Sequence, residues 1–331
     1  MNNSSDINFE KPKVIPALLS GFNTIANKPY LMIFPIILDL FLWFGPAWRV
    51  ETYFRSIIQG LFSLPGLNTA ENAGLIQETQ AIWQELVANI NLAMSLRTLP
   101  IGIPSLMVFK PPFLNPLGRP FIFDLNTNGQ VLGIWTLFLV AGFFLGSIYF
   151  QNISWQIIDP HEKNKFKATL RSFIQTILMP FLLLIILLII LIPIALLSTI
   201  ASLISPAVGQ FILLFAGVAL LWIVMPLIFT PHGVFLYRQN VVTAMITSIN
   251  VVRLSMGNTL WYILTSFVLI EGLNYLWQTP AVDSWFLIIG IFGHAFIVTA
   301  VIASSFHYFI DATKFTQAVL NQRMKPESTP L

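Results

Sequence analysis

The stretch FLLLIILLIILI, Phe181–Ile192, decides the fold of this chain. A water-exposed helix does not carry twelve apolar residues in a row, and this run lies within a longer apolar segment, Phe173–Ser198. A helix of roughly 20 apolar residues crosses the hydrocarbon core of a bilayer, which is about 30 Å thick. Lipid offers the backbone no hydrogen-bond partners, so such a segment must pair its own N–H and C=O groups as a helix. We therefore expect a transmembrane helix here.

The composition of the whole chain points the same way. Of its 331 residues, 56% are hydrophobic and 9% are charged, whereas a soluble domain carries about 25% charged residues. This balance excludes a soluble domain, a disordered chain and a nucleic-acid-binding protein. The chain has no cysteine, which excludes disulfides, thiolate metal sites and cysteine nucleophiles. Its four histidines are too dispersed to predict a metal site. We expect an integral membrane protein that carries no cofactor and binds no nucleic acid.

Five further segments have the length and apolar character of the first. The six expected spans are Tyr30–Trp48, Val131–Ile153, Phe173–Ser198, Phe211–Phe229, Thr259–Trp277 and Trp285–Ser305. The sequence thus predicts an all-α fold, a polytopic bundle of about six transmembrane helices in which residues 1–331 form a single integral membrane domain. A largely helical extracytoplasmic insertion, residues 49–130, separates the first two spans.

The distribution of lysine and arginine predicts the orientation of the bundle. If the N-terminus is inside, the cytosolic segments hold 12 of the 17 basic residues, and the other 5 all lie in the long insertion. Positive charge is enriched on the cytosolic side of membrane proteins, and long translocated segments largely escape this rule. We expect a multi-pass protein of the cell (cytoplasmic) membrane with both termini in the cytosol.

The insertion divides into a helical part and a proline-rich part. Apolar residues at helical spacing predict an amphipathic helix over Asn72–Arg97. Residues 98–125 are apolar but contain six prolines, which prevent a continuous helix. We expect this proline-rich part to lie over the mouth of the bundle or to dip into the headgroup layer. It is either a structural cap or a lid that contacts a substrate.

Three short stretches with an apolar stripe precede the spans that run outward. They cover residues 18–25, 166–173 and 241–252, and their pattern is typical of helices that lie in the membrane interface. The sequence therefore predicts three similar units, each an interfacial helix followed by a transmembrane hairpin.

Ionisable residues at membrane depth are the candidate functional residues. Asp39 lies near the middle of the first span and His294 near the middle of the sixth, while Glu271 and Asn274 share one face of the fifth. A charge at mid-bilayer costs roughly 2.5–3.5 kcal/mol on insertion scales. In one interpretation each group is neutralised separately within the bundle. In the other, the four residues form one polar cluster that binds a cation, relays protons or holds a polar substrate.

Two further features concern packing and lipid contact. Gly142 and Gly146 form a GxxxG pattern in the second span, which allows another helix to approach closely. Basic residues cluster beside the expected cytosolic surface, where each gains about 1 kcal/mol from anionic lipid. We expect anionic-lipid contact at Lys163, Lys165, Lys167 and Arg171.

One segment resembles a known family. The stretch NVVTAMITSINVVRLSMGNTLWYILTSFVLIEGL, Asn240–Leu273, is an amphipathic stretch followed by a small polar break, Ser255–Asn258, and a hydrophobic helix. It resembles segments of uncharacterised bacterial six-span membrane proteins, which look distantly related to the membrane domain attached to some glycerophosphodiester phosphodiesterases. The resemblance covers roughly a tenth of the chain and implies a six-span fold. The chain has no catalytic phosphodiesterase domain, so the resemblance implies no hydrolysis.

These observations leave three functions open. The first is a non-enzymatic structural or accessory component of a membrane process, whose partners are membrane lipids and either another membrane protein or a second copy of the chain. The second is a small-solute or proton-coupled transporter that uses the Asp/Glu/His layer. The third is a lipid-acting membrane enzyme with acid and base groups at a headgroup-level cleft. The sequence has no phosphate-binding loop or nucleophile elbow, which weighs against an enzyme without excluding one.

Overall fold

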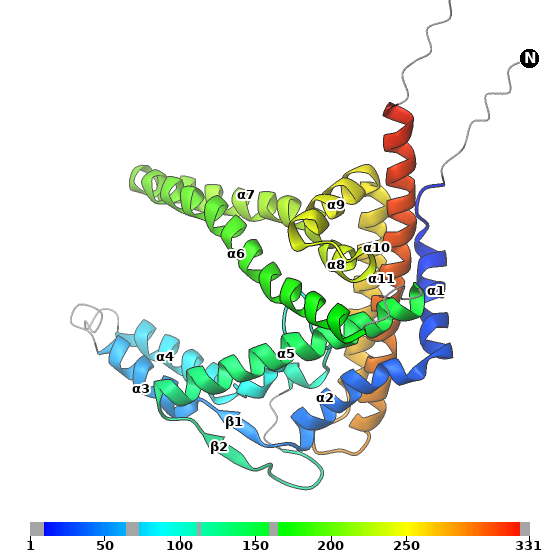
Figure 1. Cartoon of the computed structure of the whole chain (residues 1–331). Helices are drawn as coiled ribbons and strands as arrows, with labels where there is room; N and C mark the ends of the chain where they lie inside the picture. The colour runs from blue at the N-terminus through cyan, green and yellow to red at the C-terminus, as the bar shows by residue number, and fades with distance from the viewer. Residues whose placement is uncertain (1–9, 64–72, 111–113, 159–164, 325–331) are drawn as a thin grey trace, which may run out of the picture. The chain divides into compact units, whose positions relative to one another are not determined.

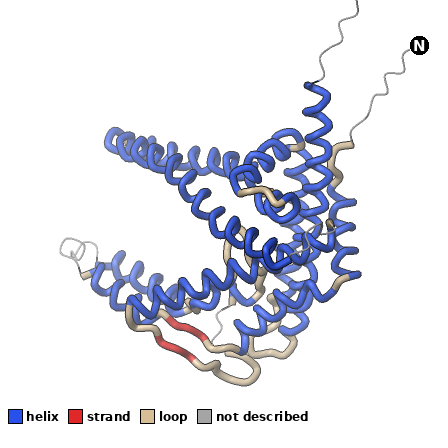
Figure 2. Tube along the Cα trace, viewed as in Figure 1, coloured by secondary structure: helices blue, strands red, loops and turns tan. Residues whose placement is uncertain are grey.

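The structure, a computed structural model, describes residues 10–63, 73–110, 114–158 and 165–324, and in them two short strands accompany the helices (Figure 2). The α-helices are α1 (Val14–Asn27), α2 (Ile33–Phe44), α3 (Glu51–Phe62), α4 (Ala73–Ala88), α5 (Asn128–Ile157), α6 (Lys165–Ile204), α7 (Pro206–Val224), α8 (Thr230–Tyr237), α9 (Val241–Leu254), α10 (Met256–Trp277) and α11 (Leu287–Met324). The 3₁₀ helices are η1 (Pro29–Met32), η2 (Leu92–Leu96), η3 (Met107–Phe109) and η4 (Met225–Leu227). Strands β1 (Ala47–Arg49) and β2 (Ile122–Asp124) pair in parallel, with Trp48 opposite Phe123. The predicted all-α class is confirmed.

Five helical segments of the described chain are long and apolar enough to cross a membrane. They are α5, α6, the α7–α8 segment Pro206–Tyr237, α10 and α11. A sixth span results only if α1 and the η1–α2 segment Pro29–Phe44 are counted as one broken span. The chain is thus built as a multi-pass membrane protein.

The first predicted span, Tyr30–Trp48, is shorter in the structure than the sequence pattern indicated. Only Ile33–Phe44, 12 residues, is α-helical. A proline has no N–H to donate and disfavours helical geometry in the residue before it, so Pro29 separates α1 from the following helix. At the other end Gly45 adopts an extended conformation and the chain continues into β1. Twelve helical residues rise about 18 Å, less than the roughly 30 Å of a hydrocarbon core.

Two predicted helices differ in their bounds. The expected interfacial stretch at residues 166–173 is no separate helix but the first part of α6, which runs unbroken for 40 residues. The expected helix Asn72–Arg97 ends at Ala88, and Asn72 itself lies outside the described residues. Asn91 explains the interruption, because its side-chain oxygen accepts hydrogen bonds from the N–H groups of Ala93 (3.1 Å) and Trp48 (3.0 Å).

The chain folds into two compact units, and α5, α10 and α11 contribute to both. Unit 1 comprises Met1–Asn27, Phe150–Val268 and Ala300–Leu331, and unit 2 comprises Lys28–Tyr149 and Leu269–Thr299. Each unit has a core of its own.

The core of unit 1 is a group of aromatic side chains between α8 and the second half of α11. Phe229 stacks on Tyr308 with ring centroids 5.7 Å apart, and the His232 ring lies 4.6 Å from that of Phe306. Residues 230–236 of α8 are all buried. Helix α9, which covers the predicted interfacial stretch at residues 241–252, packs against α8.

Helix α1 also belongs to unit 1 and packs closely on α11. A Cβ on Gly21 would lie 2.5 Å from the Ser304 backbone nitrogen, so only glycine permits this approach. One turn further, the Thr24 hydroxyl and the His307 Nε2 atom are hydrogen-bonded at 3.1 Å.

A long apolar hairpin completes unit 1. Helices α6 and α7 lie side by side in Figure 1 and are joined by a single residue, Ser205. Pro206 opens α7 at a position where the missing N–H costs nothing, and the Ser198 hydroxyl donates to the Gly209 carbonyl at 3.0 Å. In the most apolar stretch of each arm only 6% of the residues are buried. The hairpin therefore exposes hydrophobic side chains around most of its circumference.

Unit 2 is built around the proline-rich part of the insertion. Ile101, Ile103, Leu106 and Met107 are almost fully buried. The predicted GxxxG pair does permit close approach, but the partner is the insertion, from the end of η2 to Gly102, rather than another long helix. A Cβ on Gly142 would overlap the Leu96 carbonyl oxygen.

Candidate functional site

Asp39 lies in the middle of α2 and is fully buried in unit 2. Its carboxylate accepts hydrogen bonds from the Ser105 hydroxyl (2.5 Å) and from the backbone N–H groups of Leu106 (3.1 Å) and Met107 (3.1 Å). These donors lie at the start of η3, where the first N–H groups of a helical turn have no partner within the turn. Asp39 therefore fastens the proline-rich part of the insertion to α2.

Arg97 supplies positive charge to the same region of unit 2. This half-buried residue follows η2, and its charge interacts with those of Asp39 and Glu271. Burial lowers the pKa of Arg97, and the two carboxylates oppose that shift. Arg97 is not among the residues that the sequence pattern singled out. The sequence feature that could have identified Arg97 is a basic side chain within an otherwise apolar stretch of the insertion, next to the six prolines.

His294 and Asn274 form a second polar contact in unit 2. The His294 Nδ1 atom lies 2.7 Å from the Asn274 Oδ1 atom, and both residues are buried. Because an amide oxygen only accepts hydrogen bonds, Nδ1 carries the proton and Nε2 presents a lone pair. Among the described residues, the buried Nε2 atom has no hydrogen-bond partner. His294 thus keeps one free acceptor inside the fold.

Two glycines position His294. Gly290 and Gly293 let α11 approach the last turn of α10, and a Cβ on Gly293 would lie 2.8 Å from the ring of Trp277. The Trp277 ring consequently packs directly on the α11 backbone, one turn from Asn274 on its own helix. The spacing of Asn274 and His294 along the chain does not predict their hydrogen bond, because the bond depends on how α10 and α11 cross.

Glu271 differs from the other three predicted residues because its side chain is exposed on α10. In the described part of the chain, no hydrogen bond joins the Asp39 carboxylate to Glu271, Asn274 or His294. The positive charge of Arg97 acts on Asp39, Glu271 and His294 alike. The four residues are therefore split into a hydrogen-bonded Asp39 anchor, a His294–Asn274 pair and an exposed Glu271, with Arg97 in electrostatic reach of the ionisable three.

A lysine further along the insertion links it to the loop between α10 and α11 in unit 2. The Lys110 Nζ atom donates to the carbonyl oxygens of Gln278 (2.8 Å) and Pro280 (2.7 Å), which lie between α10 and α11. Burial lowers the pKa of Lys110. The 105–110 stretch is therefore anchored at its start by hydrogen bonds to Asp39 and at its end by those that Lys110 donates.

The basic group beside α6 belongs to unit 1 and is exposed. Lys165 Nζ lies 5.5 Å from the centroid of the Trp155 ring, a cation–π distance, and Lys167 and Arg171 follow along the first turns of α6. Lys163 lies outside the described residues. Contact with anionic lipid at these positions stays a prediction.

Comparison with known proteins does not assign the chain to a family. No protein-family model matches the chain, and no curated protein or solved structure matches it either. Among the described residues, no group of three or more His, Cys, Asp or Glu is placed to hold a metal ion.

Proposed function

We propose that the chain is a non-enzymatic structural or accessory component of a membrane process. The observation that carries this proposal is that Asp39, the carboxylate nearest the middle of a predicted span, is hydrogen-bonded within the fold. Its oxygens are engaged by three donors of the insertion. A buried carboxylate satisfied in this way stabilises the fold and has little capacity left for a substrate.

The α6–α7 hairpin supports the same proposal from a different direction. Its arms are apolar on nearly all sides and pack mainly on each other. In a bilayer such a surface faces lipid or the helices of another membrane protein, because neither contact leaves a polar group unpaired. The partner that the proposal expects is a membrane protein or a second copy of this chain.

Photocrosslinking in native membranes tests this proposal. Because the chain has no cysteine, the single substitutions Ile189→Cys on α6 and Leu214→Cys on α7 each give one labelling position for a photoactivatable maleimide. Phe286→Cys, an exposed apolar position in unit 2, is the matched control. We expect adducts of discrete mass from the two hairpin positions and lipid adducts alone from the control. Lipid adducts alone at all three positions would contradict the proposal.

A second candidate, a proton-coupled or small-solute transporter, has one specific observation in its favour. The buried Nε2 atom of His294 has no partner in the described structure. A histidine with one free ring nitrogen can take up and release a proton.

Proteoliposomes loaded with a pH-sensitive dye distinguish the two functions. Transport predicts solute-dependent proton movement that is lost in His294→Gln and kept in His307→Gln, a histidine that belongs to unit 1. The accessory role predicts no solute-dependent proton movement from the wild-type protein across a panel of sugars, amino acids and ions.

A further inference from the structure

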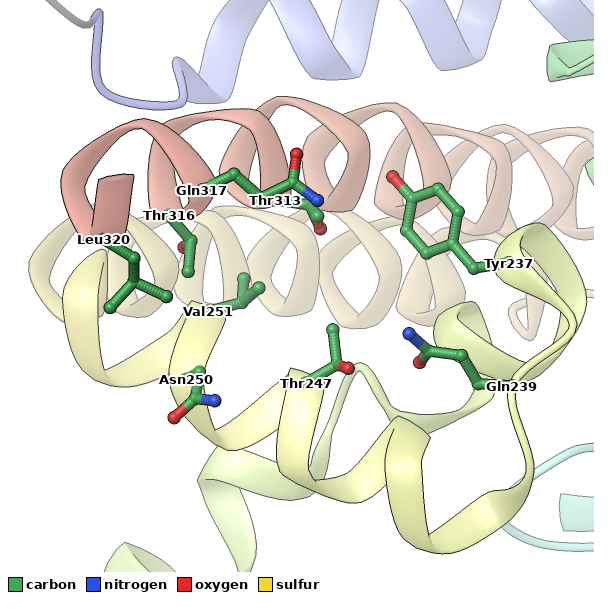
Figure 3. Close-up of a pocket in the computed structure, with 9 residues that line it drawn as sticks. All are labelled: Tyr237, Gln239, Thr247, Asn250, Val251, Thr313, Thr316, Gln317 and Leu320. Carbon is green, nitrogen blue, oxygen red and sulfur yellow. The ribbon is translucent and has the colours of Figure 1, made fainter. Parts of the chain in front are cut away.

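An open pocket of about 240 Å³ lies in unit 1, between α8, α9 and the last turns of α11 (Figure 3). Three carboxamide side chains line it, from Gln239, Asn250 and Gln317, together with the hydroxyl groups of Thr247 and Thr316. None of the described residues that line it carries a charge at neutral pH. The pocket therefore offers hydrogen bonds without a counter-ion.

Thr316 lines this pocket and has a buried hydroxyl that the fold leaves without a partner among the described residues. Threonine hydroxyls inside helices usually donate to the carbonyl four residues earlier, and Thr313 does so, to Phe309 at 2.7 Å. Thr316 is only 4% exposed, yet its hydroxyl has no hydrogen-bond partner among the described residues. A buried polar atom left without a partner costs free energy, which a bound ligand would recover.

Gln239, which also lines the pocket, has a second buried atom without a partner in the described part of the chain. Its Oε1 atom is buried without a partner in the described structure. The residue before it, Arg238, adopts a left-handed backbone conformation (φ 54°), which ends α8 and turns the chain so that the Gln239 N–H bonds the Gly233 carbonyl at 3.2 Å. The backbone at Gln239 is thus fixed, and its carboxamide oxygen packs beside Gly233 at the edge of the pocket.

The lining defines the chemistry of the ligand. Carboxamides and hydroxyls both donate and accept, so they pair best with hydroxyl groups, which do the same. Val251 and Leu320 provide apolar surface beside them, and the Tyr237 ring adds a face on which C–H groups pack. Pockets for drug-sized ligands span about 300–1,000 Å³, so this one takes a single small group.

From these observations we propose that the pocket binds a neutral polyhydroxylated group, a sugar ring or a polyol. The group is either a free solute or the headgroup of a membrane lipid. The proposal goes beyond the structural or accessory role, because it assigns a ligand to a part of the chain that this role does not use.

The binding experiment uses the full-length protein in phosphatidylcholine nanodiscs, since detergents with sugar headgroups would occupy the site. Free myo-inositol, glucose and glycerol are tested by saturation-transfer NMR. In parallel, the protein is equilibrated with vesicles that contain phosphatidylcholine and either a monoglycosyldiacylglycerol, whose headgroup is neutral, or phosphatidic acid, an anionic control without a polyol, and the retained lipids are identified by native mass spectrometry. Binding of a free polyol identifies a solute site, and enrichment of a polyol-headed lipid identifies a headgroup site.

Three variants make the result specific. Thr316→Val keeps the shape of the side chain and removes the unpartnered hydroxyl, so we expect about tenfold weaker binding. Thr247→Phe fills the pocket and leaves Thr316 in place, so we expect binding to be lost. The control is Thr265→Val, because Thr265 is exposed on α10 and its hydroxyl is satisfied by the Trp261 carbonyl. The proposal is overturned if neither a free polyol nor a polyol-headed lipid binds, or if both pocket variants bind as the wild type does.

Discussion

At the scale of single residues, the buried carboxylate of Asp39 decides how the insertion is held. Asparagine in its place keeps the size of the side chain, but its amide NH₂ group faces N–H and O–H donors. We expect Asp39→Asn to destabilise the protein by about 1.5–3 kcal/mol, the range for hydrogen bonds to charged groups. Thermal unfolding in nanodiscs measures the change, and hydrogen exchange of residues 99–110 should rise with it.

The matched control for Asp39 is Asp283→Asn, because Asp283 is exposed. This variant should unfold like the wild type. Unchanged exchange in residues 99–110 of the Asp39 variant would show that the carboxylate does not hold the insertion.

Glu51 gives a residue-scale prediction that depends on pH. It accepts from Arg49 Nη1 at 3.0 Å and from Arg55, and the bond from Arg49 is the main reason why its pKa lies below the usual 4.5. A depressed folded-state pKa stabilises the fold above the unfolded-state value, and this contribution is lost as pH falls through the folded-state pKa. We expect Glu51→Gln to unfold at a lower temperature than the wild type at pH 7, and the difference to shrink at pH 3. Glu78→Gln on the exposed face of α4 should show no difference at either pH.

At the scale of elements, two glycines of the same helix have opposite roles. Gly142 lies where α5 touches the backbone of the insertion, whereas a Cβ on Gly133 would meet no atom within 4 Å. Gly142→Ala must displace the segment at Leu96, and overpacking of this kind typically costs about 1–3 kcal/mol. Gly133→Ala should instead be neutral or raise stability by up to about 1 kcal/mol, because alanine is the better helix former. Unfolding temperatures of both variants in the same lipid test the pair, and equal effects would contradict the packing.

The bounds of the elements also mark the limits of the sequence pattern. The apolar run Phe181–Ile192 predicted a helix correctly because a membrane span depends on composition alone. Asn91 and Pro29 were harder to interpret, because a cap or a break depends on which neighbouring groups are free to bond. The partner of Gly142 could not be predicted either, since GxxxG indicates close approach and does not identify the segment that approaches.

At the scale of the whole molecule, the orientation in the membrane is the prediction that follows from charge. Both termini are expected in the cytosol and the insertion outside. The absence of cysteine makes this simple to test with Lys314→Cys near the C-terminus and Arg119→Cys in the insertion, both exposed positions. In intact cells an impermeant maleimide should label the Arg119 variant alone, and permeabilisation should add the Lys314 variant. The reverse order would invert the topology.

The candidate residues show the same division between composition and geometry. Asp39 and His294 could be selected from the sequence because ionisable groups are costly in a span. Asn274 could be selected as well, but its hydrogen bond to His294 and that of Ser105 to Asp39 could not be predicted, because both depend on tertiary packing. Thr316 could not be selected from the sequence, because nothing in the sequence distinguishes a threonine whose hydroxyl is hydrogen-bonded from one whose hydroxyl is not.

The hairpin of α6 and α7 bears on how the protein is made. Its two arms leave the ribosome one after the other, and the contacts that hold them together are almost all their own. A nascent chain that has been synthesised to the end of α7 therefore already contains a helical pair that the translocon can insert into the bilayer. The middle of the polypeptide can be integrated before α11, which completes both compact units, has been synthesised.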